Sequence, residues 1–125
     1  MNRNNSAIKP LFTAILLIVL TSGFFACTKY QYTLPAVDPA ATWHLQTDIQ
    51  PIFTANCTAC HGNAITPDLR EGKSYQALTK AGYVTLPAES SKLYLKMTSS
   101  SHISRSTETE RLKVLYWITQ GAKNN

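Results

Sequence analysis

The sequence predicts a small all-α domain that follows an apolar N-terminal segment. The chain has 125 residues, which is enough for one domain. After residue 42, helix-capping residues alternate with apolar residues at helical spacing. We therefore divide the chain into residues 1–26, residues 27–42 and a folded domain over residues 43–125.

Residues 1–26 have the order of a secretory signal peptide. Residues 1–10 carry two cations and no acid, residues 11–20 are almost wholly apolar, and small residues follow. Ala26 and Cys27 resemble the cleavage site of bacterial lipoproteins, in which the cysteine after the cut is lipidated. An uncleaved anchor helix and ordinary secretion remain open, although the apolar stretch is shorter than the roughly 20 residues that span a bilayer.

Residues 27–42 are expected to form a lipidated tether, because Pro35 and Pro39 bar a continuous helix. The formal net charge of the whole chain is +5, but two of its twelve cations and none of its seven acids precede Cys27. The remaining cations are scattered, with no basic stripe and no aromatic platform beside one. This pattern argues against nucleic acid as a partner.

The central motif is Cys57, Cys60 and His61, in the spacing Cys-x-x-Cys-His. This is the attachment sequence of one covalent c-type haem: each thiol bonds a vinyl group of the porphyrin, and His61 becomes the proximal iron ligand. Export fits the motif, because c-type haem is attached in oxidising compartments. A zinc site that borrows His44 or His102 and a redox dithiol are the alternatives.

The helix before the motif is expected to begin at the cap Asp48 and to deliver Cys57, with Pro51 in its first turn. Residues 61–69 are rich in turn formers and predict a loop.

Three more helices are expected after this loop. The second helix covers residues 75–80, with Ser74 as its cap and Gly82 as its stop, and the third follows the cap Ser90 through Met97.

The last helix starts from a capping box at Thr107 and Glu110 and runs to Gln120, with Gly121 as its stop. Residues 114–118 are all apolar or aromatic, which predicts burial on more than one side of this helix.

Residues 43–125 resemble the small monohaem cytochrome c domains of bacterial exported lipoproteins. Besides the haem motif, residues 48–53 and residues 117–122 match the patterns that flank it in this family. The resemblance implies a cytochrome c-like helical fold around one haem. It also implies that the first and last helices cross beside the haem, with Phe53 against Tyr116 or Trp117.

The family also places a proline after the haem histidine, whose carbonyl oxygen accepts a hydrogen bond from the imidazole. Pro67 is the matching position, so the resemblance implies that it orients His61.

The sixth iron ligand is open between two residues. His102 stands five residues before the Thr107 cap, where the family carries its methionine, and Met97 is the only methionine after the first residue. We expect His102 as the distal ligand and keep Met97 as the alternative, followed by an open site and by His44. Two histidines predict a lower potential than histidine with methionine.

No serine, histidine and aspartate set, no paired carboxylates and no phosphate loop are evident. We therefore expect an electron carrier rather than an enzyme, anchored in the bacterial cell envelope and facing the periplasm or the exterior, with redox proteins as partners. The alternatives are a haem-based sensor with an open sixth site and a zinc or dithiol lipoprotein without haem.

Overall fold

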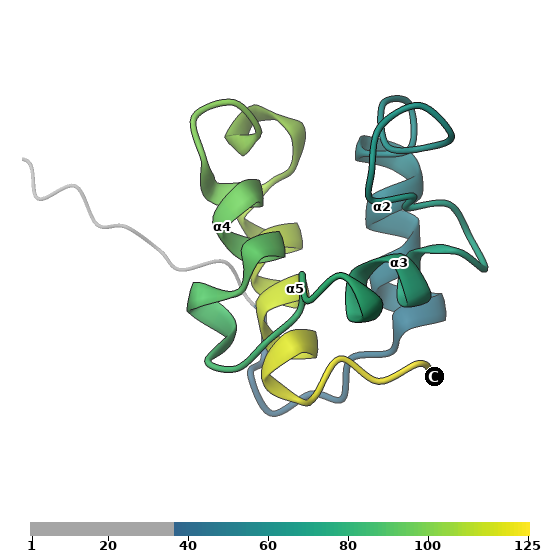
Figure 1. Ribbon diagram of the computed structural model, residues 1–125. Helices are drawn as coiled ribbons and strands as arrows, with labels where there is room; N and C mark the ends of the chain where they lie inside the picture. Colours follow the sequence, from purple (N-terminus) through teal and green to yellow (C-terminus); the bar gives the residue numbers. More distant parts are fainter. Residues whose placement is uncertain (1–36) are drawn as a thin grey trace, which may run out of the picture. The chain divides into compact units, whose positions relative to one another are not determined.

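The computed structural model describes residues 37–125, and every regular element in this range is helical. Figure 1 shows α2 and α3 on one side and α4 with α5 on the other. The described residues belong to a compact unit, Pro35–Asn125. The expected signal peptide, Cys27 and most of the tether lie outside the described range. In that range no helix has the length and the apolar character that crossing a membrane requires.

The first helical segment consists of a π-helical turn, η2 (Leu45–Ile49), that continues into α2 (Gln50–Asn56). The expected cap at Asp48 is wrong, because the segment begins after His44. The Asp48 carboxylate instead accepts a hydrogen bond from the His44 backbone N–H at 2.9 Å. Pro51 has no N–H to donate, and its ring crowds the preceding turn. These two properties account for the π-helical geometry of η2, just before Pro51.

The second helix, α3 (Ser74–Lys80), is present, and its expected cap is displaced by one residue. Lys73 takes the cap position, so Ser74 is the first residue of the helix, and its hydroxyl donates to the Gln50 side chain. Gly82 ends this segment as predicted, at a φ of 62°, a conformation that glycine adopts without strain.

The third helix, α4 (Lys92–Thr98), follows a short 3-10 turn, η3 (Ala88–Ser90). Ser91 rather than Ser90 is the cap, and its hydroxyl accepts from the Tyr94 N–H at 3.4 Å. Ser90 is part of the 3-10 turn, where its hydroxyl donates to the Pro87 carbonyl oxygen. A second 3-10 turn, η4 (Ile103–Arg105), comes after α4.

The last helix, α5 (Glu108–Thr119), starts from the predicted capping box. The Thr107 hydroxyl accepts from the Glu110 N–H at 3.2 Å, and the Glu110 carboxylate accepts from the Thr107 N–H at 2.7 Å. Gly121 follows the helix at a φ of 92°. Three residues of the apolar run are buried, and the other two are half-buried: Val114, Trp117 and Ile118, with Leu115 and Tyr116.

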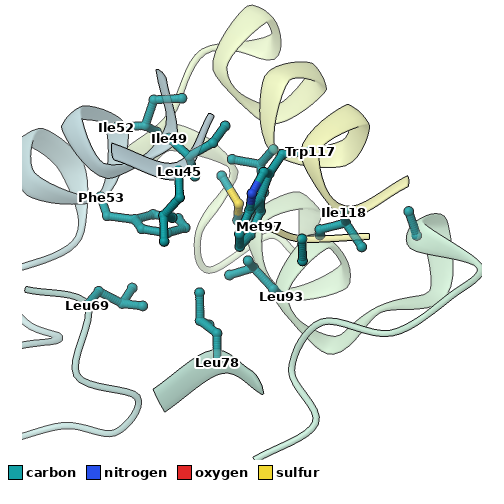
Figure 2. Packing of buried hydrophobic residues seen from close by; sticks show 13 residues of the cluster. Leu45, Ile49, Ile52, Phe53, Leu69, Leu78, Leu93, Met97, Trp117 and Ile118 are labelled. Atoms are coloured by element: carbon teal, nitrogen blue, oxygen red, sulfur yellow. The ribbon is translucent and has the colours of Figure 1, made fainter. Parts of the chain in front are cut away.

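The core lies where η2 and α4 pack on α5. Figure 2 shows Leu45 and Ile49 on the same side as Phe53, with Met97 beside the indole of Trp117. Among the segments before the motif, η2 makes the main contacts with α5, and Phe53 belongs to the same buried cluster as Trp117. The N–H of Leu45 and that of Gln46 both donate to Asn125, which ties this segment to the end of the chain.

Candidate functional site

The Cys-x-x-Cys-His motif forms a turn at the C-terminal end of α2. The Cys57 N–H donates to the Phe53 carbonyl oxygen at 2.8 Å, and the His61 N–H donates to the Cys57 carbonyl oxygen at 2.8 Å. The turn directly continues α2, so the helix fixes the backbone positions from which the side chains of Cys57 and His61 extend. This brings the three residues of the motif together, as the sequence predicts.

Both thiols of the motif are free, with Cys57 half-buried and Cys60 exposed. Burial raises the pKa of the Cys57 thiol, and the charges of Glu110 and Cys60 act in the same direction. A redox dithiol requires the opposite, a thiol whose pKa is lowered. This environment favours a protonated, weakly nucleophilic thiol.

The loop after His61 is closed by one backbone hydrogen bond, from the Leu69 N–H to the His61 carbonyl oxygen at 2.8 Å. The expected bond from the His61 imidazole to Pro67 is not formed. His61 Nδ1 is buried and has no hydrogen-bond partner, although Pro67 and His61 line the same cavity. The loop instead uses the His61 backbone oxygen to fix its far end, which leaves the imidazole nitrogen unpaired.

His102 lies just before η4 and faces His61. The two ring centroids are 6.2 Å apart and the ring planes are inclined by 46°. The His102 Nδ1 shares a hydrogen bond with the Ser101 hydroxyl at 2.9 Å. Because the partner of one ring nitrogen decides which nitrogen is left for a metal, this bond leaves Nε2 as the candidate ligand atom.

The pKa of His102 is lowered, first by partial burial and then by the nearby charge of Lys96. Both effects favour the neutral imidazole. This is the form that can bind a metal ion, because a protonated imidazole has no free lone pair.

An apolar cavity of about 60 Å³ separates the two histidines. It is walled on one side by Phe53 and Leu69 and on the other by Leu93 and Met97. Figure 2 shows Leu69 and Met97 on opposite sides of the space between α2 and α4. Met97 is only 7% exposed and belongs to the buried cluster, so packing accounts for its presence.

The separation of the histidines fits a shared metal ion. Two imidazoles bound on opposite sides of one ion, with a metal–nitrogen bond of about 2 Å and a ring radius of about 1.1 Å, have centroids about 6 Å apart. The observed distance is 6.2 Å. Cys57, His61 and His102 line the cavity, and Cys60 is exposed in the same turn as Cys57. Two thiols and a histidine in this turn are the groups that a covalently attached haem would use.

The cavity itself is smaller than a haem, because cofactor sites enclose roughly 300–1,000 Å³. The spacing of His61 and His102 would suit two ligands of one iron, whereas the side chains around them would have to move outward to admit a porphyrin.

The same residues fit a zinc site less well than they fit a haem. In residues 37–125 no three His, Cys, Asp or Glu side chains come together as a metal-binding group. His44 lies at the start of η2, where its Nδ1 is 3.6 Å from the Asp48 carboxylate. The contact of its imidazole with Asp48 therefore explains His44 without a metal ion.

Sequence reasoning missed three polar residues around the site. Ser101 bonds the His102 ring, and Gln50 and Ser74 form a buried hydrogen-bonded pair beside the loop after His61. The position of Ser101 next to a histidine offered a weak signal. Gln50 and Ser74 offered none, because nothing in the sequence shows that they meet.

Comparison of the chain with protein-family models, with curated proteins and with solved structures found no match in any of the three.

Proposed function

We propose that this protein is a one-electron carrier, a monohaem c-type cytochrome anchored in the bacterial cell envelope. The observation that carries the proposal is the pair of facing imidazoles, His61 in the Cys-x-x-Cys-His turn and His102 before η4, with centroids 6.2 Å apart. The haem, when bound, supplies the change between ferric and ferrous iron.

The residues of the motif have distinct roles in this proposal. Cys57 and Cys60 hold the porphyrin by thioether bonds, and His61 binds the iron on the side of α2. The free state of both thiols supports this role, because a disulfide between them would leave none for attachment. The raised pKa of the Cys57 thiol argues against disulfide exchange, which needs a thiolate.

His102 is the proposed sixth ligand. Its ring faces His61, and its Nδ1 is occupied by Ser101, which fixes the ring with Nε2 free for the iron. Met97 is the weaker alternative, since its burial in the core is explained by packing. Two imidazole ligands favour a carrier over a sensor, because a sensor needs an open or easily displaced sixth position.

The surroundings of the site suit electron transfer better than catalysis. Apolar side chains line the cavity, which lowers the local dielectric and tunes the iron potential, and no acid lies among its lining residues. A groove of about 580 Å³ along α3 shares Pro67 and Tyr83 with the cavity wall and carries Lys73 and Lys80. Asp68 also lines the groove, but it is paired with Arg70 at 2.6 Å, so the two lysines suit an acidic redox protein as partner.

The proposal places the domain at a membrane through lipid on Cys27, after removal of residues 1–26. It then faces the periplasm or the exterior, where haem attachment occurs. This part rests on the sequence pattern of the N-terminal segment.

The deciding experiment is the absorption spectrum of the protein matured in a host that attaches haem c. We expect a Soret band that survives denaturation, a low-spin spectrum in both oxidation states, and no change of the ferrous form with carbon monoxide. Binding of carbon monoxide would favour the sensor. The absence of any haem band would refute both haem proposals.

A further inference from the structure

A buried amide connects α2 to the loop that follows His61. Gln50, in the first turn of α2, is 4% exposed. Its Nε2 donates to the Leu69 carbonyl oxygen at 2.9 Å, and its Oε1 accepts from the Ser74 hydroxyl at 2.5 Å. A second, longer bond runs from Nε2 to the Thr54 hydroxyl at 3.3 Å. Both ends of the amide are therefore used, as burial of a polar group requires.

These bonds continue to the backbone of His61. The Leu69 N–H donates to the His61 carbonyl oxygen, and the His61 N–H donates to the Cys57 carbonyl oxygen, both at 2.8 Å. His61 is thus held from two sides, by the end of α2 and by Leu69. Leu69 in turn is tied to α2 by the side chain of Gln50.

The imidazole of His61 gains no orientation from a hydrogen bond of its own. Its Nδ1 is buried without a partner, whereas metal-bound histidines ordinarily donate this N–H to a neighbouring acceptor that fixes the ring. The direction of the ring consequently depends on the backbone of His61 and on the packing around it. Leu69 contributes to both, because its side chain lines the same cavity as the ring.

We infer that Gln50, supported by Ser74, is a positioning residue for the haem ligand His61 and acts through Leu69. The inference rests on the proposed haem function, because the angle of the imidazole matters only when it binds iron. Gln50 does not touch the ligand. It holds Leu69, at the end of the loop, in place. Leu69 in turn fixes the His61 carbonyl oxygen through its N–H and the cavity wall through its side chain.

The test compares Gln50→Met with Gln46→Met in the haem-loaded protein. Methionine has nearly the length of glutamine and makes no comparable hydrogen bond. Gln46 is an exposed glutamine of η2 whose amide bonds only Asn124 among the described residues, so it controls for the substitution itself. Two readouts are measured: amide hydrogen exchange at Leu69, and the principal g values of the ferric electron paramagnetic resonance signal, which depend on imidazole orientation.

In Gln50→Met, we expect Leu69 to exchange at least about tenfold faster and the ferric signal to shift or broaden. Gln46→Met is expected to keep wild-type values for both. Unchanged exchange at Leu69 in Gln50→Met would overturn the inference. Faster exchange with unchanged g values would also overturn it, since the amide would then be purely structural.

Ser74→Ala provides a milder variant in case Gln50→Met does not fold. It removes the bond from Ser74 to Gln50 and keeps the bond from Gln50 to Leu69. We therefore expect smaller changes in the exchange at Leu69 and in the g values. Wild-type values for both would contradict the inference. Failure of the proposed function would give a different result from failure of the inference. A wild-type protein without a haem band refutes the carrier, while exchange at Leu69 still reports whether Gln50 holds the loop.

Discussion

The imidazole rings of His61 and His102 face each other with their centroids 6.2 Å apart. His61 extends from the end of α2, whereas His102 precedes η4 at the far end of α4. Figure 1 shows the two connecting loops rising at the same end of the described unit. Four predictions follow from this arrangement and from the bonds that maintain it.

Replacing His102 by alanine should open the sixth iron position. We expect His102→Ala to lose the low-spin spectrum and to bind carbon monoxide in the ferrous state. Met97→Ala should keep the wild-type spectrum and unfold more easily, by about 2–5 kcal/mol, because it leaves a cavity in the core. Absorption spectroscopy and denaturant unfolding measure the two effects. The reverse pattern would assign the iron to Met97.

Removing both thiols should remove the haem and most of the folded structure with it. The walls of the cavity, among them Leu69 and Leu93, face the space where the porphyrin would lie. Without it, these apolar side chains would lose a surface against which they are buried, and this part of the core would be open to water. We expect Cys57→Ala/Cys60→Ala to show no cooperative thermal transition by circular dichroism. A cooperative melt without haem would prove this wrong.

Glu110 should contribute stability that is lost in acid. Burial alone would raise its pKa, but hydrogen bonds from Thr107 and Asn56 and the charge of Lys113 outweigh it, so the pKa lies below the usual 4.5. A carboxyl with a lowered folded-state pKa stabilises the fold above its unfolded pKa and loses this effect as the pH falls through the folded value.

We therefore expect Glu110→Gln to be less stable than wild type by about 0.5–1 kcal/mol at neutral pH. The difference should shrink as the pH falls below 4.5. Urea unfolding of both proteins across this range measures it. The partly buried Cys57 thiol senses the same charge, but it would be a thioether in a haem-loaded protein and would not titrate there. A difference that is constant with pH would contradict the assignment.

Gln120 should anchor the segment before η2 to the end of α5. Its Oε1 accepts from the Trp43 N–H at 3.0 Å, and its Nε2 donates to the Ala41 carbonyl oxygen at 2.8 Å. Gln120→Ala leaves both half-buried backbone groups unpaired, at a cost of about 1–3 kcal/mol. Gln46→Ala is the matched control, because its exposed amide bond should cost under about 0.5 kcal/mol. Equal effects of the two changes would contradict the anchor.

The positions of the helices could be predicted from the sequence, whereas three of the four expected caps could not. The capping box of Thr107 and Glu110 is encoded in four consecutive residues, so its prediction is confirmed. The expected cap at Asp48 is wrong, and those at Ser74 and Ser90 are each displaced by one residue. Ser74 lies inside α3 with its hydroxyl bonded to Gln50, and Ser90 lies in a 3-10 turn with its hydroxyl bonded to Pro87, contacts that local pattern reading does not reveal.

In the candidate site, too, some residues could be predicted from the sequence and others could not. Cys57, Cys60 and His61 are neighbours in the chain, and the geometry of one helical turn suffices to bring them together. The choice between His102 and Met97 had no local answer, because both lie in the stretch that leads to α5. Both line the cavity beside His61 in the fold. Met97 is also buried in the core beside Trp117, whereas the His102 ring lies 6.2 Å from that of His61.

By itself the sequence determined the helical class, the motif turn and the last helix, because each depends on residues within one or two turns of each other. Only the tertiary structure decided which histidine faces His61, that its Nδ1 finds no acceptor at Pro67, and that Gln50 holds the loop at Leu69. These relationships join α2, α3 and the loop before η4. They arise when separate segments must bury their polar groups in partnership, a requirement that acts across space and leaves no spacing in the sequence.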